Sequence, residues 1–266
     1  MTTEAALSGI VVLDLTQIIA GPFCTMVLAD MGANVIKVEK PNGGDDNRRM
    51  GPPFIKDWSA GFLALNRNKR SLVLDLRSES GQAVFKRLVA DVDVVVENFR
   101  PGVMGRLGLG YETLAEIKPN LVYCSVSGFG NTGPDAAKGG FDLVAQGVSG
   151  LMSITGHPEM PPAKVGVPIT DISAGLLAAN GILCAYIHAL KTGQGQQVDT
   201  SLMEAGVAYT VWESSVYFAD GEIPGPLGSA HRVSAPYQAL RTLDGYLNIG
   251  AATQPPWEQL CRAIGL

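Results

Sequence analysis

Short runs of apolar, often β-branched residues alternate with longer stretches of helical periodicity along most of the chain. The short runs predict strands, because strands that are buried on both faces of a sheet consist largely of Val, Ile and Leu. The predicted strands cover residues 10–15, 34–38, 72–76, 92–96, 121–126 and 197–201. The spacing of apolar residues between and after them predicts helices over residues 22–31, 80–88, 111–117, 145–154 and 203–217.

This alternation of strands and helices predicts an α/β fold with a Rossmann-like, doubly wound and mostly parallel sheet. We expect the resulting large domain to cover residues 1–220, and the glycine- and proline-rich residues 221–228 to form a linker. Residues 229–266 then form the beginning of a smaller α+β domain. It contains a predicted hairpin around Leu243-Asp-Gly245 and a short helix, over residues 237–240, 246–249 and 257–264.

Residues 172–190 carry no charged side chain, and their length is close to that of a membrane-spanning helix. The segment nevertheless contains Ser173, Asn180 and His188, and it lies within an otherwise regular α/β pattern. We therefore expect a buried helix of the core rather than a membrane span. A glycine at position 193 is a typical helix end.

Composition narrows the class of protein. Apolar residues make up 46% of the chain and charged residues only 17%, so a large buried core is expected. The net charge of −5 and the pI near 5.2 argue against nucleic-acid binding. The four cysteines show neither a disulfide nor a metal-binding pattern, and the N-terminal MTTEAALSG lacks the basic region of a signal peptide. These features predict a cytoplasmic protein without a metal site or a membrane partner.

Several common catalytic motifs are missing. The turn after the first strand, residues 19–23, does not contain the GxGxxG of dinucleotide-binding proteins. The chain contains neither a phosphate-binding P-loop nor the GxSxG motif of serine hydrolases. Its three histidines lie in unrelated contexts, so a His-based triad or metal centre is not expected.

Asp171 precedes the uncharged segment, and two interpretations are open. Thr170 or Asp171 can serve as a helix cap that accepts hydrogen bonds from free N–H groups. Alternatively, a carboxylate at the mouth of an apolar helix is partly desolvated and can act as a covalent nucleophile. In that case Gly166 and Gly175 would let a bulky acyl group approach.

Cationic residues cluster after predicted strands or in neighbouring loops, where open α/β sheets bind ligands. They are Lys37, Lys40, Arg48, Arg49, Arg67, Lys69, Arg70, Arg100, Arg106 and Lys138. In an acidic chain this grouping is compatible with a polyphosphate ligand. The alternative is ordinary solvated surface charge.

Taken together, these segments resemble the family III CoA-transferases, a group that includes formyl-CoA and carnitine CoA-transferases and the α-methylacyl-CoA racemases. The resemblance runs through nearly the whole chain, and its strength lies in the order and number of short motifs. The matching stretches are residues 13–22, 32–39, 66–71, 97–108, 127–134, 166–175, 191–199 and 235–246.

The resemblance implies a covalent mechanism on Asp171, which aligns with the catalytic aspartate of the family. Asp171 would attack the thioester of an acyl-CoA to give an aspartyl anhydride and CoA thiolate, which then form an aspartyl-CoA thioester. A second carboxylic acid would reverse these steps and leave as its CoA thioester. CoA and acyl-CoA are substrates in this scheme, and no metal or permanently bound cofactor is implied.

The resemblance also assigns CoA contacts position by position. Gln17, Ile18 and Ala20 would line the CoA tail, and Lys40 and Arg106 would contact the phosphates. Leu74, Asn98 and Phe99 would contact the nucleotide, and Lys138 would add a further cation. The glycine-rich loop that follows residue 127 is an expected lid.

Racemases of this group are the nearest alternative, but they need a histidine at the position of Phe141, which carries no titratable proton. Transfer is therefore favoured over racemisation. Ile19 is apolar where the formyl-CoA branch has a polar residue, which disfavours formyl or oxalyl substrates. A dicarboxylic acid such as succinate is the preferred substrate class.

Chains of the family extend past the equivalent of Leu266 and interlock as homodimers. We therefore expect the smaller domain to be truncated relative to the family, and the partners to be acyl-CoA, a carboxylic acid and a second copy of the chain. An inactive, truncated relative that still binds CoA is the second hypothesis.

Overall fold

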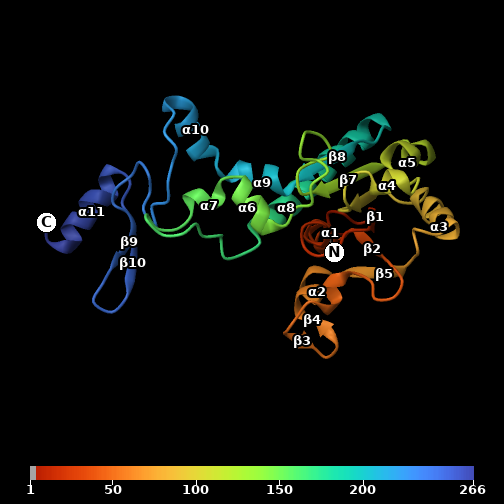
Figure 1. Cartoon of the computed structure of the whole chain (residues 1–266), viewed down its shortest axis with the longest axis horizontal. Helices are drawn as coiled ribbons and strands as arrows, with labels where there is room; N and C mark the ends of the chain where they lie inside the picture. Colours follow the sequence, from red (N-terminus) through yellow and green to blue (C-terminus); the bar gives the residue numbers. More distant parts are fainter. Residues whose placement is uncertain (1–3) are drawn as a thin grey trace.

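The computed structural model describes residues 4–266. Its centre is a parallel sheet of six strands in the order β5-β2-β1-β6-β7-β8 (Figure 1). These strands are β1 (Val11–Asp14), β2 (Asn34–Glu39), β5 (Lys69–Val73), β6 (Val94–Glu97), β7 (Val122–Ser127) and β8 (Gln197–Ser201). The strand order reverses between β1 and β6, and ligands of such sheets bind at the carboxyl ends of the strands near this point. The predicted doubly wound sheet is confirmed.

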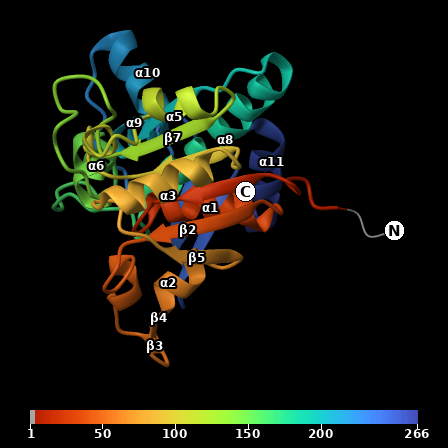
Figure 2. The same cartoon turned by 90° about the vertical axis from the view of Figure 1, so that its right-hand side faces the viewer.

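Apolar side chains cover both faces of the sheet, as the near-continuous apolar strands predicted. Along β1, Val12 belongs to one buried cluster and Leu13 to the other, because neighbouring residues of a strand point to opposite faces. Figure 2 shows β2 beside β5, with β7 farther across the same sheet. The helices of the two layers are α1 (Ala20–Asp30), α8 (Ile169–Thr192) and α9 (Leu202–Tyr209) on one face, and α3 (Glu79–Val89), α4 (Val103–Arg106) and α5 (Tyr111–Ile117) on the other.

Helix α8 is the uncharged segment, and it forms part of the core. By length and composition it could cross a membrane, and 44% of its most apolar window is buried. Its buried residues include Ala174, Ala178, Ala185 and Ala189, which recur at helical spacing. This stripe of small residues packs against α1 and the sheet, so the expected core helix is confirmed.

Two predicted helices are broken in the structure. Residues 145–154 contain the end of α6 (Asp142–Val148) and all of α7 (Leu151–Ile154), separated at Gly150, whose φ of +86° interrupts the helix. The segment predicted as 203–217 divides at Thr210 into α9 and α10 (Val211–Asp220).

The edge strand β5 lies three residues earlier than predicted. It begins at Lys69, because its polar first residues pair with β2 although they break the apolar pattern. Leu74 therefore follows the strand instead of lying within it. The pattern also missed several short elements that follow β2 or flank β5, namely η1 (Asp46–Arg49), β3 (Phe54–Ile55), β4 (Trp58–Ser59) and α2 (Ala60–Leu65).

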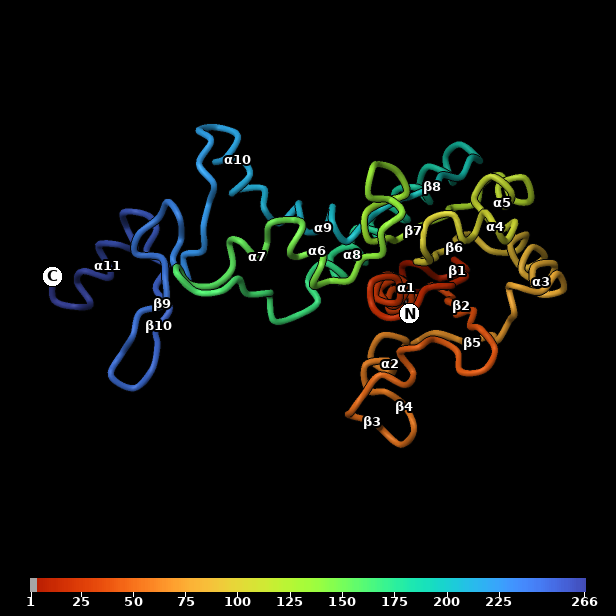
Figure 3. The backbone as a smooth tube through the Cα atoms, in the orientation of Figure 1, coloured from red at the N-terminus to blue at the C-terminus, as the bar shows by residue number. Residues whose placement is uncertain are grey.

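The last part of the chain projects away from the sheet, beyond α10 (Figures 1 and 3). It contains the predicted hairpin and helix, which are β9 (Tyr237–Arg241), β10 (Tyr246–Gly250) and α11 (Gln254–Ile264). None of the residues of α11 is buried. The division into two domains at residues 221–228 stays a prediction.

Candidate active site

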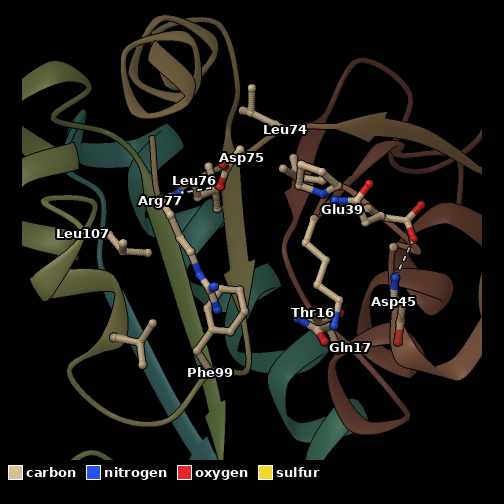
Figure 4. A pocket seen from close by; sticks show the side chains of 16 residues that line it. Thr16, Gln17, Glu39, Asp45, Leu74, Asp75, Leu76, Arg77, Phe99 and Leu107 are labelled. Atoms are coloured by element: carbon tan, nitrogen blue, oxygen red, sulfur yellow. Dashed lines mark hydrogen bonds between the residues drawn. The ribbon is translucent and has the colours of Figure 1, made fainter. Parts of the chain in front are cut away.

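Two cavities lie side by side where β1, β2 and β6 end. The first, of about 450 Å³, is lined by Asp171 and is called the Asp171 cavity below. The second, of about 470 Å³, is lined by Lys40 and is called the Lys40 cavity (Figure 4). Gln17 and Phe99 line both cavities, so one extended ligand could occupy the two together. Each volume is typical of a small-molecule site.

The structure brings together all the predicted site residues except one. Gln17, Lys40, Leu74 and Phe99 line the Lys40 cavity. The residues of the Asp171 cavity include Gln17, Ile18, Ala20, Asn98, Phe99, Lys138 and Asp171. Arg106 is the exception, because its exposed side chain lies on α4 beside the cavity-lining residues Val103 and Leu107. The individual contacts with CoA stay predictions.

Asp171 lies in the first turn of α8, with its carboxyl group partly buried. Within residues 4–266 its carboxylate accepts no hydrogen bond, although buried carboxylates are normally paired. Burial, and then the negative charge of Asp142, raise the pKa of Asp171 to about 7. The result is a carboxyl group that titrates near neutral pH and has no partner in the described part of the chain.

The capping interpretation of Thr170 or Asp171 is wrong, because another helix supplies the cap. Pro168 occupies the N-cap position of α8 and offers no side-chain hydrogen bond. Instead, Oδ1 of Asp142 accepts hydrogen bonds from the Thr170 backbone N–H at 2.9 Å and from its hydroxyl at 2.8 Å. Gln146 donates to the other oxygen of Asp142 at 2.7 Å. Asp142 thus stabilises the helix start and leaves Asp171 free.

Gly175 does not open space for an acyl group, contrary to expectation. A Cβ atom at this position would lie 2.6 Å from the carbonyl oxygen of Ala20, so the glycine allows α1 and α8 to touch. This contact holds the start of α1, and with it the turn after β1, against the first turns of α8. Gly166 does lie in open space, because a Cβ atom added there would have no neighbouring atom within 4 Å.

The turn after β1 is held by Asn98, which follows β6. The Gln17 N–H donates to Oδ1 of Asn98 at 2.8 Å, and Nδ2 of Asn98 donates to the Gln17 carbonyl at 2.8 Å. This reciprocal pair joins the two strand ends at the reversal point of the sheet. The amide group of Asn98 is thereby occupied, so Asn98 shapes the cavity in this structure mainly by holding the turn.

A model of the family described as CoA-transferase family III matches residues 7–266. The chain belongs to CoA-transferase family III. It is 43% identical to a succinate–glutarate CoA-transferase of Agrobacterium fabrum, over 98% of this chain and 66% of that protein. It is 42% identical to a human succinyl-CoA:glutarate CoA-transferase, over 100% of this chain and 61% of that protein.

Among solved structures, a CAIB/BAIF family protein from Brucella suis superposes with a TM-score of 0.90 at 42% identity. The match covers 99% of this chain and 70% of that one. With 66% and 61% of the two CoA-transferases covered, the family III chain spans less than two thirds of the length of either relative.

The cations of this family III chain do not form one phosphate site. Lys37 pairs with Asp45 at 3.0 Å and Lys69 with Asp14 at 3.0 Å, and both lysines are buried. Other charge pairs engage Arg48 with Glu39 and Arg67 with Asp30. Four of the ten grouped cations are thus engaged in ion pairs, and the ten do not form a single phosphate site.

The cations that do line the cavities lie at their open rims. Lys40 and Lys138 form exposed pairs with Asp46 at 2.6 Å and Asp135 at 2.7 Å, which solvent weakens. Arg77 lines the Lys40 cavity and was missed (Figure 4). Its position directly after a predicted strand was the signal that could have identified it.

Proposed function

We propose that this chain transfers CoA between an acyl-CoA thioester and a free dicarboxylic acid, with Asp171 as the covalent nucleophile. The observation that carries the proposal is the partly buried Asp171 carboxyl group without a hydrogen-bond donor among residues 4–266. It lines a cavity that shares Gln17 and Phe99 with a second, cation-rimmed cavity. The names of the two relatives, both of which include glutarate, support a dicarboxylic substrate.

In the proposed reaction, a carboxylate oxygen of Asp171 attacks the carbonyl carbon of the thioester. The C–S bond breaks, giving a mixed aspartyl anhydride and CoA thiolate. The thiolate then attacks the aspartyl carbonyl, so that an aspartyl-CoA thioester forms and the first carboxylate leaves. The second carboxylate attacks this thioester, and the same steps in reverse order release its CoA thioester and regenerate Asp171.

The environment of Asp171 suits this role. A carboxylate that accepts no hydrogen bonds keeps its lone pairs available for attack, and desolvation makes it more reactive than in water. Only the ionised form is nucleophilic, so turnover should increase as the pH rises through the pKa of about 7.

The walls of the two cavities support the proposed ligands. Ile18, Ile19 and Phe141 give the Asp171 cavity apolar surface, which limits hydrolysis of an anhydride. Arg100 and Lys138 line the same cavity and would attract carboxylate anions. Lys40 and Arg77 supply the Lys40 cavity with positive charge for the phosphates of CoA.

The racemase alternative receives no support from this site. Phe141 lines the Asp171 cavity, and its side chain cannot exchange a proton with an acyl α-carbon.

We further propose a cytoplasmic homodimer without a permanently bound cofactor. Large apolar side chains that are exposed on α8 and α10, including Leu190 at 69% and Phe218 at 83%, support a second copy as the partner.

Label exchange tests the proposal. Isotopically labelled succinate or glutarate is incubated with its unlabelled CoA thioester, and label in the thioester is measured over time. The proposal predicts exchange by the wild type and none by Asp171→Ala, with thermal unfolding showing that the variant is folded. Equal exchange by the two proteins would contradict it, and absence of exchange in both would favour the inactive CoA-binding relative.

A further inference from the structure

The turn that separates the two cavities contains a strained residue. Ile18 has a φ of +70°, in the left-handed region that glycine adopts readily and β-branched residues avoid. Within residues 4–266, the other non-glycine residues with positive φ are Asn, Lys or Glu, which tolerate this region better. Such strain persists only where surrounding groups enforce it, and it clusters at functional sites.

Hydrogen bonds from the segment after β2 enforce this conformation. The Ile18 N–H donates to Oδ1 of Asp45 at 3.2 Å, and the Ile18 carbonyl accepts from Nδ2 of Asn47 at 2.9 Å. Asn98 forms two further hydrogen bonds with the backbone of Gln17. The backbone N–H and carbonyl groups of residues 17 and 18 are therefore all hydrogen-bonded to side chains.

The groups that hold Ile18 are themselves anchored in the core. Asp45 is 2% exposed and forms an ion pair with Lys37 at 3.0 Å, and Lys37 donates to the Thr16 carbonyl at 2.7 Å. Asn47 is 5% exposed, and its N–H donates to Oδ1 of Asp45 at 3.0 Å. The turn therefore rests on a buried charge pair rather than on mobile surface groups.

A glycine at position 18 would adopt the same backbone conformation without strain, but it would provide no side chain. The Ile18 side chain lines the cavity that contains Asp171. Isoleucine stands at position 18 although its backbone conformation is strained there. This indicates that its side chain has a function in the cavity.

We infer that Asp45, Asn47 and Asn98 are positioning residues that lock the 17–18 turn and hold the Ile18 side chain as a fixed apolar wall excluding water from acylated Asp171. This inference rests on the proposed function. Without the wall, water would attack the acyl carbonyl of the anhydride, releasing the free acid, the Asp171 carboxylate and a proton. The net result would be hydrolysis of acyl-CoA to acid and free CoA thiol.

The strain can be tested without any activity. At most sites alanine is more stable than glycine, because glycine loses more backbone freedom on folding. At position 18 we expect the reverse order, with Ile18→Gly melting about 2–5 °C above Ile18→Ala. Val126 is the control, because it lines the same cavity from within β7, where glycine is unfavourable, and there the alanine variant should melt higher. An alanine variant at position 18 as stable as the glycine variant would overturn the inference.

The wall is tested by the partition between hydrolysis and transfer. Free CoA thiol released from succinyl-CoA is measured against label exchanged into the thioester. Ile18→Gly, Ile18→Ala and Asn47→Ala should each raise hydrolysis per transfer at least about three-fold, and Ile18→Val should not. Asn47 is informative because it lies outside the Asp171 cavity, and its truncation keeps the Ile18 side chain chemically intact while removing a hydrogen bond that holds it.

The outcomes separate the two proposals. If the wild type exchanges label and the variants show the same ratio of hydrolysis to transfer as the wild type, the role of Ile18 as a wall is contradicted. The proposed function is then unaffected. A wild type without exchange would contradict the proposed function, and the melting order at position 18 would then decide whether the turn is strained and clamped.

Discussion

Two carboxyl groups of this protein, Asp14 and Asp171, are removed from water in opposite ways. Asp14 ends β1 with a side chain that is 0% exposed, and it accepts hydrogen bonds from Thr16, Thr25 and Lys69. Burial alone would raise its pKa, but Lys69, Lys37 and the hydroxyl groups outweigh burial and lower the pKa to about 2. Asp171 is less buried, yet its pKa rises to about 7, because only burial and the charge of Asp142 act on it.

The comparison teaches that the number of hydrogen-bonding and charged partners, more than the degree of burial, distinguishes a structural carboxylate from a reactive one. Asp14 is permanently charged and its lone pairs are occupied, so it holds the end of β1 in place. Asp171 keeps its lone pairs, titrates near neutral pH and faces a cavity. Asp142, not Asp171, accepts the hydrogen bonds at the start of α8, and Asp171 accepts none within residues 4–266.

The largest effect is expected from removing the partnered carboxylate. Asp14→Ala leaves the buried Lys69 ammonium without its counter-charge, and should lower the free energy of unfolding by about 3–5 kcal/mol. Urea unfolding at pH 7 measures the loss. Asp30→Ala is the control, because its pair with Arg67 is exposed and should contribute less than about 1 kcal/mol. Equal losses in the two variants would contradict the assigned role of Asp14.

Removing the unpartnered carboxylate of Asp171 should stabilise the fold rather than destabilise it. The pKa of Asp171 is higher in the folded than in the unfolded chain, so its ionisation destabilises the fold as the pH rises from about 4 to about 7. Asp171→Asn should therefore raise the free energy of unfolding by about 1–3 kcal/mol at pH 8, after allowance for partial exposure. The gain should disappear below about pH 4. Urea unfolding at both pH values tests this, and a variant less stable at pH 8 would show that Asp171 has a stabilising partner.

The contact that positions α8 can be tested at Gly175. Gly175→Ala places a Cβ against the Ala20 carbonyl, and should destabilise the fold by about 1–3 kcal/mol. Gly166→Ala is the matched control, with a change within about 0.5 kcal/mol, because no atom lies within 4 Å of its added carbon. Chemical unfolding of both variants decides between a packing role and the acyl-access role for Gly175.

The smallest effect is expected from the neighbouring charge. Asp142→Asn keeps an oxygen that can accept from Thr170 but removes the negative charge beside Asp171. The pKa of Asp171 should fall but stay above its usual range, because burial is the larger cause of its rise. The acid limb of the rate profile for CoA transfer should move to lower pH in parallel. An unchanged profile in a folded variant would mean that burial alone sets the pKa.

Much of the fold was predictable, because long apolar patterns survive tertiary packing. The bounds of α5 and β8 match the prediction, and α1 and α3 differ by only one or two residues at their ends. The predicted element bounds were wrong where the local pattern of apolar residues does not match the contacts formed in the folded chain. The edge strand β5 begins with polar residues that pair with β2, and Gly150 interrupts a helix that its neighbours favour.

The candidate site was predictable in membership but not in organisation. The position of Asp171 before an uncharged helix singled it out, and the resemblance to CoA-transferase family III assigned its catalytic role and the neighbouring residues. The capping of α8 by Asp142, the packing of Gly175 on Ala20 and the clamp on Ile18 each join segments far apart in sequence. No local pattern encodes such contacts, which is why the roles assigned to Thr170, Gly175 and the buried lysines were wrong.

The most direct test of the central claim is the mass of the intact protein after incubation with succinyl-CoA, followed by peptide mapping. The account predicts that a fraction of the protein gains the mass of a succinyl group or of CoA, located on the peptide that contains Asp171 and absent from Asp171→Asn. A mass gain at another residue, or the same gain in the variant, would contradict covalent catalysis by the unpartnered carboxylate.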